Sequence, residues 1–487
     1  MTASDHLREG APVTQSDESA GAAPTDGRYD VVILGGGSGG YATALRAAQL
    51  GLSVALVEKD KLGGTCLHRG CIPTKALLHS AEIADAARDG AQFGVKATFD
   101  GIDMAAVNAY KDGVVTRLYK GLTGLVSGRG VTYVTGEGRL VAADRVAVGD
   151  EVYVGRNVVL ASGSVPRSLP GIEIDGARVI TSDHALALDY VPRSVIVLGG
   201  GVIGVEFASV WRSFGADVTV VEALPHLLPN EDVDLSKGIE RAFRKRKIGF
   251  ELGAKVDKVE ATATGVQVSL ETGKSLEADV LLVAVGRAPV SEGLGYAEAG
   301  VAMDRGYVVV DDHMRTNVPQ VYAVGDLVPT LQLAHVGFGE GILVAEQIAG
   351  LGPRAIDYAG VPRITYSEPE VASVGLTQQQ ATQRYGADAV TTVTYDLAGN
   401  GKSQILKTAG FVKLVATKLA DGSAGPVVGV HLIGSRVGEL LAEGQLIYNW
   451  EAYADDVANL IHAHPTQTEA MGEAHLALAG KPLHAHA

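Results

Sequence analysis

The sequence predicts an α/β protein in which two similar parallel-sheet domains are followed by an α+β domain. A pattern of strand, glycine-rich turn, helix and strand occurs twice along the chain. The C-terminal part instead carries β-branched runs such as Phe411–Val415 and Val427–His431, followed by helical patterns. With 487 residues, of which 46% are hydrophobic, the chain is long enough for three or four domains with large cores.

The first pattern opens with Tyr29–Leu34, a short apolar run typical of a buried parallel strand. The turn Gly35-x-Gly37-x-x-Gly40 follows, then a helical pattern through Leu50 and a second strand, Ser53–Val57, that ends at Glu58. The three glycines permit, in order, a tight turn, a close approach of backbone to a pyrophosphate, and packing of helix on strand. The helix N-terminus offers N–H groups to phosphate, and we expect Glu58 to accept hydrogen bonds from a ribose.

The second pattern repeats the first at the same spacing. Ser194–Leu198 is the strand, Gly199-x-Gly201-x-x-Gly204 the turn, and Asp217–Val221 the next strand, which ends at Glu222. Glu58 lies 23 residues after Gly35, and Glu222 lies 23 residues after Gly199. One such turn is weak support, whereas two with matching spacing indicate two Rossmann-like dinucleotide-binding domains and a relay of electrons between two dinucleotides.

The residue type at Glu222 predicts which nicotinamide dinucleotide is bound. A carboxylate there hydrogen-bonds a ribose 2′-hydroxyl and repels a 2′-phosphate, for which arginine is the usual partner. Residues 223–228 contain no arginine. NAD is therefore the predicted ligand of the second domain.

The only two cysteines, Cys66 and Cys71, lie close together in the segment Gly63–Lys75. Pro73 is placed where the chain enters a helix predicted over Ala76–Ala87, and a helix N-terminus favours the thiolate. A closed zinc site would need four ligands, and His68 is the one further candidate beside the pair. Two buried small side chains are the other alternative. Because the segment is bracketed by glycines and follows a dinucleotide unit, we interpret the pair as a redox centre.

Composition and charge exclude several other classes. The net charge of −15 disfavours nucleic-acid and anionic-membrane binding, and we interpret Arg244–Lys247 as the solvated face of a helix. No stretch reaches the roughly 20 apolar residues of a membrane helix. Residues 1–28 lack the apolar core of a secretory signal. They carry five acidic residues against two arginines, which argues against a transit peptide. We expect a disordered tail and a cytoplasmic protein.

The cysteine segment resembles the redox-disulfide motif of the pyridine-nucleotide disulfide oxidoreductases, and within that family it is most similar to the dihydrolipoamide dehydrogenases. The resemblance extends over residues 29–475 and includes Ala161–Ser164, Val285–Pro289, Ala323–Asp326 and Leu333–His335. It implies FAD in the first domain and NAD in the second. It also implies a redox-active Cys66–Cys71 disulfide that oxidises dihydrolipoyl groups, in a role that belongs to cell redox homeostasis.

The resemblance assigns residues to the two cofactors one by one. Lys75 and Glu206 match positions beside the flavin ring, and Asp326 matches the residue that holds the ribityl chain. The implied FAD residues are Gly35, Gly37, Gly40, Glu58, Lys75, Gly138, Ser162, Gly163, Ser164, Asp326, Ala334 and His335. The implied NAD residues are Gly199, Gly201, Gly204, Glu222, Val256 and Gly286. No metal is implied.

A histidine near the C-terminus completes the predicted site. Exchange between a dithiol and a disulfide needs a base, and a carboxylate on the second ring nitrogen orients the imidazole. His464 and Glu469 fit these roles and match the family's His–Glu pair, whereas His462 and His475 are weaker candidates. The resemblance implies a homodimer in which the histidine is supplied across the interface, with lipoyl domains of 2-oxoacid dehydrogenase or glycine cleavage complexes as partners.

The implied domains are a tail (1–28), an FAD domain (29–165), an NAD domain (166–290), a central region completing the FAD site (291–360) and an interface domain (361–487). One alternative is an NAD(P)H-dependent reductase of a small disulfide such as glutathione disulfide. The sequence pattern of glutathione reductase departs from this chain at three positions. It has alanine at the position of Gly204, arginine at that of Glu222, and a substrate-binding arginine at that of Leu45. Another alternative is a non-catalytic subunit of a dehydrogenase complex, which the intact cysteines and His464 disfavour.

Overall fold

The computed structural model describes residues 22–484 and divides them into two compact units. The first unit contains the chain up to Gly64 together with Tyr119–Gly163 and Val290–Ala355. The second contains Thr65–Leu118, Ser164–Pro289 and the chain from Ile356 onward. Most of the predicted tail, residues 1–28, lies outside the described residues.

The first unit is built on a sheet whose strands run in the order β3-β2-β1-β6-β5-β4, with β19 also paired to β6. The strands β3, β2, β1, β6 and β19 are parallel, while β4 and β5 form an antiparallel extension. Their bounds are β1 Tyr29–Leu34, β2 Val54–Glu58, β3 Thr132–Thr135, β4 Gly138–Ala142, β5 Arg145–Val148, β6 Glu151–Leu160 and β19 Val321–Ala323. The last four residues of β1 are buried, as expected for a parallel strand covered on both faces.

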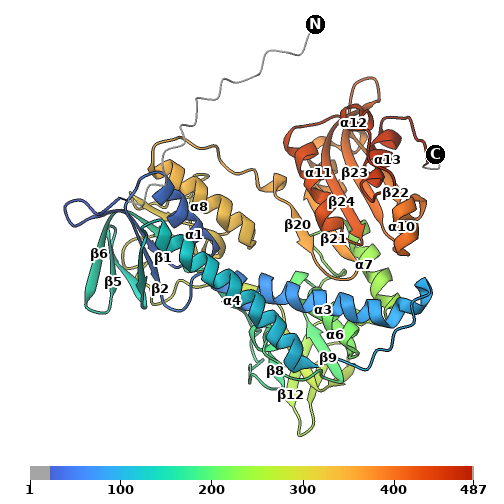
Figure 1. The fold of residues 1–487 in the computed structure, drawn as a ribbon, viewed down its shortest axis with the longest axis horizontal. Helices are drawn as coiled ribbons and strands as arrows, with labels where there is room; N and C mark the ends of the chain where they lie inside the picture. Colours follow the sequence, from blue (N-terminus) through green and yellow to red (C-terminus); the bar gives the residue numbers. More distant parts are fainter. Residues whose placement is uncertain (1–21, 485–487) are drawn as a thin grey trace. The chain divides into compact units, whose positions relative to one another are not determined.

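Two helices of this unit pack against each other beside the sheet. They are α1 (Ser38–Gln49) and α8 (Ala334–Ile348), drawn in blue and orange in Figure 1. Small residues permit this contact, because a Cβ built at Gly341 would lie 2.5 Å from the carbonyl oxygen of Gly39. The unit also contains a short hairpin, β17 (Met303–Asp304) and β18 (Tyr307–Val308). The long helix α4 (Met104–Gly128) contributes residues to both units.

The second unit repeats the parallel arrangement, with strand order β11-β10-β9-β15-β8. Its helices α6 and α7 and the antiparallel sheet β12-β13-β14 accompany that sheet, and β7 pairs with β16. The bounds are β7 Ser164–Pro166, β8 Val179–Ile180, α5 Ser182–Ala185, β9 Ser194–Leu198, α6 Val202–Phe214, β10 Asp217–Glu222, α7 Val233–Lys245, β11 Gly249–Leu252, β12 Val256–Ala261, β13 Val266–Leu270, β14 Ser275–Ala278, β15 Val280–Val283 and β16 Arg287–Pro289.

The C-terminal part of the second unit is an antiparallel sheet with strand order β20-β21-β24-β23-β22, and helices pack on it. The bounds are β20 Arg363–Thr365, β21 Glu370–Gly375, α9 Gln378–Tyr385, β22 Val390–Asp396, α10 Gly401–Leu406, β23 Phe411–Lys418, β24 Ala424–Gly434, α11 Val437–Asn449, α12 Ala454–Ala458 and α13 Glu469–Leu478. Two parallel-sheet domains and an α+β domain are thus present, and the predicted fold class is confirmed.

The cysteine segment is more helical than the sequence predicted. A short helix α2 spans Gly64–Arg69, and α3 spans Cys71–Asp89, so α3 begins five residues before the predicted Ala76. Pro73 therefore lies inside the first turn of α3. That position is tolerated, because the N–H groups of a first turn have no partner within the helix.

The two glycine turns have the same geometry, which confirms the duplication. A Cβ built on Gly40 would lie 1.8 Å from the carbonyl oxygen of Gly35, and one on Gly204 would lie 1.9 Å from that of Gly199. At both sites, therefore, only a glycine lets the helix pack this closely on the strand. A Cβ on Gly201, by contrast, would meet nothing within 4 Å.

We predict that Gly204→Ala destabilises the fold, whereas Gly201→Ala has little effect on stability. The first variant forces backbone apart, and overpacking of this kind costs about 1–3 kcal/mol. The second adds a methyl group to open space at a helix N-cap, where the poorer capping by alanine is largely offset by the lower entropy of the unfolded chain, so that we expect a loss of only a few tenths of a kcal/mol. Chemical denaturation of both variants measures the difference. Equal denaturation midpoints for the two variants would contradict the conclusion that the turn requires glycine at residue 204.

Candidate active site

Cys66 and Cys71 are half-buried free thiols at the start of the second unit. Cys66 lies within α2, and Cys71 is the first residue of α3, as the N-cap Gly70 shows. The helix N-terminus carries a partial positive charge, which favours a thiolate at Cys71. The structure thus brings both predicted cysteines together.

The two sulfurs are not equivalent. The Cys66 thiol donates a hydrogen bond to the Cys71 sulfur, which lowers the pKa of Cys71 to about 7; burial opposes this shift and the Lys75 ammonium supports it. The same hydrogen bond and burial raise the pKa of Cys66 well above its usual value. With the pair reduced, Cys71 is therefore the sulfur with the lower pKa.

Lys75 and Glu206 form an ion pair beside the thiols. The Lys75 Nζ atom donates to Glu206 Oε1 at 2.9 Å and to Oε2 at 2.8 Å. Glu206, on α6, is 2% exposed, and its Oε1 also accepts a hydrogen bond from the backbone N–H of Tyr366 at 2.9 Å. Burial lowers the pKa of Lys75, but the carboxylate of Glu206 more than offsets this, so the pKa of Lys75 is raised overall.

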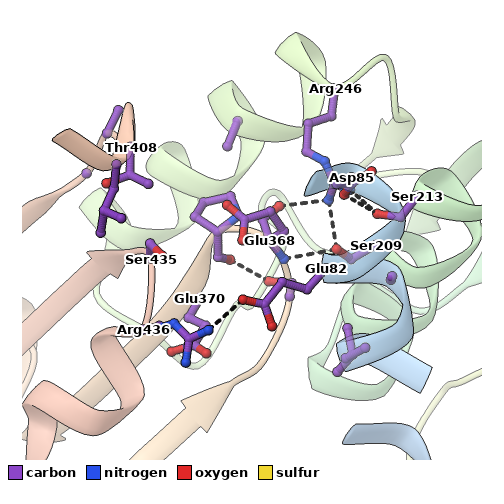
Figure 2. Close-up of a pocket in the computed structure, with 18 of the residues that line it drawn as sticks. Glu82, Asp85, Ser209, Ser213, Arg246, Glu368, Glu370, Thr408, Ser435 and Arg436 are labelled. Carbon is purple, nitrogen blue, oxygen red and sulfur yellow. Dashed lines mark hydrogen bonds and ion pairs between the residues drawn. The ribbon is translucent and has the colours of Figure 1, made fainter. Parts of the chain in front are cut away.

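A groove of about 1110 Å³ follows α3 from Lys75 to its end at Asp89 and continues to Phe93, between α6, α7 and the C-terminal sheet. Its wall contains a polar cluster centred on Arg246, shown in Figure 2. The guanidinium donates to the hydroxyls of Ser209 (2.7 Å) and Ser213 (2.6 Å), to Asp85 (3.2 Å) and to the backbone carbonyl of Glu368 (2.8 Å). Arg246 is therefore not part of a solvated helix face, and the prediction for Arg244–Lys247 was wrong at this residue.

His464 and Glu469 are paired as predicted, at the start of α13. The ring Nδ1 of His464 lies 2.8 Å from Glu469 Oε1, and the backbone N–H of Thr466 donates to Oε2 at 2.8 Å. Burial raises the pKa of Glu469, but these two hydrogen bonds lower it overall, so the group is a carboxylate at neutral pH. The His464 side chain is 78% exposed, so a substrate or a second protein chain can reach it.

The sequence interpretation missed Asn400, which fixes the loop that carries His464. Asn400 is 3% exposed, and its Nδ2 donates to the carbonyl of Thr466 at 2.9 Å. Its Oδ1 accepts from the backbone N–H of Ser403 at 2.9 Å and so caps α10. An Asn before a helical pattern is recognisable as a cap, but nothing in the sequence indicates that its amide reaches residue 466.

The weaker histidine candidates have structural contacts. The Nδ1 of His475, a fully buried residue, lies 2.7 Å from the carbonyl oxygen of Met471, and the Nε2 of His462 lies 2.8 Å from Glu443 Oε1. Burial lowers the pKa of His475 to about 4, so it is neutral at physiological pH.

Each glycine turn fits the pyrophosphate of a dinucleotide. Gly37 and Gly201 are the N-caps of α1 and α6, and neither helix N-terminus is capped by a side-chain hydrogen bond. The N–H groups of both first turns are consequently left for an anion, next to glycine backbone that lacks a Cβ. The residues present at both sites fit the expected group.

The two acidic residues at the strand ends are held alike. Glu58 accepts from the backbone N–H groups of Gly36 (2.7 Å) and Asp60 (2.8 Å), and Glu222 accepts from those of Gly200 (2.7 Å) and Leu224 (2.8 Å). A carboxylate has about four lone-pair positions, so each can still accept from a ribose hydroxyl. That ribose contact stays a prediction.

The remaining predicted cofactor residues are distributed over both units. In the first unit Ser162 donates to the carbonyl of Val290 at 2.5 Å and accepts from the hydroxyl of Tyr296 at 3.0 Å. Gly35, Gly37, Gly40, Glu58, Gly138, Gly163, Asp326, Ala334 and His335 lie in the same unit. Lys75, Ser164, Gly199, Gly201, Gly204, Glu222, Val256 and Gly286 lie in the second. Their contacts with cofactors stay predictions.

Glu340 is a second residue that the sequence interpretation missed. It is fully buried in α8, where its Oε2 accepts from the backbone N–H of Gly325 (2.6 Å) and its Oε1 from the Thr330 hydroxyl (2.7 Å). It thereby fixes the turn that presents Asp326. A carboxylate within an otherwise apolar helical pattern is the signal that could have identified it.

The described residues hold neither a metal cluster nor a membrane-spanning helix. Residues 22–484 contain no group of three or more His, Cys, Asp or Glu side chains placed to hold a metal ion. Over the same range, every helix is too short or too polar to cross a lipid bilayer.

Comparison with known proteins gives matches over almost the whole chain. The family model for pyridine nucleotide-disulphide oxidoreductases matches residues 29–341, and the model for the dimerisation domain of that family matches residues 361–475. Dihydrolipoyl dehydrogenase of Bacillus subtilis is 41% identical over 475 residues, which cover 94% of this chain and 99% of the relative. The mitochondrial dihydrolipoyl dehydrogenase 1 of Arabidopsis thaliana is 40% identical over 469 residues, covering 93% and 91% of the two chains.

A solved structure is similar at the level of the fold and of the sequence. The crystal structure of LpdA from Mycobacterium tuberculosis superposes with a TM-score of 0.85 at 28% sequence identity. The match covers 92% of this chain and 99% of that one.

We predict that Asn400→Ala loosens the loop that carries His464. The change removes a helix cap and a buried hydrogen bond, at a cost of about 1–2 kcal/mol. Hydrogen exchange of backbone amides in residues 463–468 should become faster. Thr377→Ala is the matched control, because Thr377 caps α9 in the same sheet domain. If the two variants had the same effect on residues 463–468, Asn400 would have no specific role there.

Proposed function

Because the chain belongs to the pyridine nucleotide-disulphide oxidoreductase family, we propose that it is a dihydrolipoyl dehydrogenase. In this reaction a protein-bound dihydrolipoyl group is oxidised to lipoyl, and NAD⁺ is reduced to NADH. The observation that carries the proposal is the cysteine pair itself, in which Cys71 precedes Lys75 by one turn of α3 and the Lys75 ammonium is held by Glu206. Relatives named dihydrolipoyl dehydrogenase, about 40% identical over most of the chain, support the choice of substrate.

The cofactors are those of the family, FAD and NAD. When bound, they supply the transfer of two electrons from a dithiol to the nicotinamide ring. The uncapped N-terminus of α1 and the Gly35–Gly40 turn would hold the FAD pyrophosphate, and Asp326 the ribityl chain. The N-terminus of α6 would hold the NAD pyrophosphate, with Glu222 on the ribose. Lys75 would lie at the flavin edge.

The thiols carry the first half of the cycle, which starts from the Cys66–Cys71 disulfide. A dihydrolipoyl thiolate attacks the Cys66 sulfur, the S–S bond breaks, and Cys71 leaves as a thiolate that the Lys75 ammonium stabilises. The second substrate sulfur then attacks the first, releases Cys66 and closes the lipoyl disulfide. Two electrons have moved from the substrate to the cysteine pair. The low pKa of Cys71 makes it the better leaving group.

The attacking thiol needs a base, and we assign this role to His464. Its exposed ring can take a proton at Nε2, while Glu469 on Nδ1 stabilises the imidazolium that forms. The match to the family's dimerisation domain supports a homodimer. In the proposed dimer, His464 of the partner subunit serves the cysteine pair, so that each active site is shared.

NAD is the proposed nicotinamide dinucleotide, since Glu222 disfavours a 2′-phosphate and no arginine follows in residues 223–228. The alternative, an NADPH-dependent reductase of glutathione disulfide, lacks support at this position. The proposed domains are the FAD domain (29–165), the NAD domain (166–290), the central region (291–360) and the interface domain (361–487). Lipoyl domains of 2-oxoacid dehydrogenase or glycine cleavage complexes are the proposed partners, and the cytoplasm is the proposed location.

We predict that the purified protein is yellow and reduces NAD⁺ with dihydrolipoamide. The discriminating experiment compares this reaction with oxidation of NADPH by glutathione disulfide under the same conditions. Absorbance at the nicotinamide band measures both. Activity in the second assay alone would reject the proposed function, and absence of bound flavin would reject a redox role of this kind.

We predict that His464→Gln lowers kcat for dihydrolipoamide by about 10²–10⁴-fold, because a general base contributes that much to proton transfer. Reduction of the enzyme by NADH, which does not use this base, should persist. His484→Gln is a matched control, because the Nδ1 of His484 also lies 2.8 Å from a carboxylate of α13, Glu473. A comparable loss of activity in both variants would remove His464 from the mechanism.

A further inference from the structure

Tyr366 contacts both Lys75 and Glu206, although it belongs to none of the motifs found in the sequence. It directly follows β20, in the segment that leads to Glu370 at the start of β21. Its backbone N–H donates to Glu206 Oε1 at 2.9 Å. Its ring centroid lies 4.7 Å from the Lys75 Nζ atom, within the range of a cation–π interaction. One residue of the C-terminal sheet domain thus contacts both members of the ion pair.

Lys75 is four residues after Cys71 on α3, so that the two side chains lie on the same face one turn apart. The charged and titratable groups that act on Cys71 come from three elements: Cys66 on α2, Lys75 on α3 and Glu206 on α6. Lys75 stabilises the Cys71 thiolate, whereas Glu206 disfavours it. The position of the ammonium between these two anions therefore decides how much of its charge Cys71 experiences.

An aromatic ring and a carboxylate affect the ammonium differently. Glu206 attracts Lys75 but also neutralises its field at Cys71, because the two opposite charges are in contact. The face of the Tyr366 ring attracts the cation through its quadrupole, adds no net charge and cannot accept the proton. The ring can therefore keep Lys75 protonated and in place without cancelling its effect on the sulfur. Glu370 and Glu439 also act on the Tyr366 hydroxyl, on which this role does not depend.

We propose that Tyr366 is a positioning residue for the redox centre, which holds the Lys75 ammonium beside Cys71 through its ring and orients Glu206 through its backbone N–H. The inference rests on the proposed function for the use of the Cys71 thiolate in catalysis. The contacts themselves do not depend on the identity of the substrate. In this proposal Tyr366 acts on Cys71 through Lys75.

The test measures the pKa of the Cys71 thiol directly. Cys66→Ser leaves one cysteine in the whole chain, and the serine hydroxyl can still donate a hydrogen bond to Cys71. In this background, the flavin-loaded full-length protein is alkylated with iodoacetamide over a range of pH, and the rate gives the pKa of Cys71. Tyr366 is compared with Tyr366→Phe, which keeps the ring, and Tyr366→Leu, which removes it. The backbone N–H of residue 366 is present in all three.

The expected result is a pKa of Cys71 that is about 0.5–1 unit higher in Tyr366→Leu, as the strength of a cation–π contact implies. Tyr366→Phe should leave it within the error of the measurement. An unchanged pKa in the Leu variant, or an equal rise in the Phe variant, would overturn the proposal. If the Leu variant does not fold, a pentafluorophenylalanine at residue 366 has nearly the shape of Phe but a reversed quadrupole. It should raise the pKa relative to Phe, and no rise would overturn the proposal.

Failure of this inference can be told apart from failure of the proposed function. Dihydrolipoamide oxidation is measured separately, in chains that retain Cys66. If the protein has no lipoamide activity but its Cys71 pKa still rises in Tyr366→Leu, the proposed substrate is rejected and the role of Tyr366 stands. If the protein has lipoamide activity but its Cys71 pKa does not respond to residue 366, the proposed function stands and the role of Tyr366 is rejected.

Discussion

The ion pair between Lys75 and Glu206 joins the elements on which the redox centre depends. Lys75 lies one turn after Cys71 on α3, Glu206 is buried in α6, and Tyr366 binds the pair from the segment after β20. A buried carboxylate is stable only when it is paired and hydrogen-bonded. Glu206 obtains three hydrogen bonds, two from Lys75 and one from Tyr366. The same contacts place a positive charge beside Cys71, the sulfur that leaves as a thiolate in the proposed mechanism.

A second polar contact fixes α3 further along its length. Arg246, just after α7, connects Asp85 on α3 with two serines of α6 and the backbone of Glu368. Apolar packing of Leu77 and Ala81 against Phe207 and Trp211 fills the space between the two helices. Together these contacts hold α3 rigidly behind Cys71. A rigid support is useful for thiol exchange, since reacting sulfurs must be held in line.

The four strands that flank the two glycine turns could be predicted to within a residue, because a parallel strand covered on both faces is a continuous apolar run. Tyr29–Leu34 and Ser194–Leu198 have the bounds that their sequences predicted. The start of α3 could not be predicted in this way. Pro73 indicates that a helix begins nearby, but it does not show whether the proline is the first or the third residue of that helix. The starting residue depended on Gly70, whose N-cap conformation starts the helix at Cys71.

The sequence by itself determined the chemistry: two cysteines near a helix N-terminus, two glycine turns with an acidic residue at equal distance, and a His–Glu pair. These are local patterns, and each needs only a few neighbouring residues to define it. The tertiary structure alone decided what holds Lys75 in place beside Cys71, what fixes the loop that carries His464, and that Arg246 is enclosed in a polar cluster. Asn400 and Thr466, or Tyr366 and Lys75, are far apart in the sequence and meet only because the chain folds. Sequence patterns do not record contacts of that kind, because the geometry that creates them belongs to no single segment.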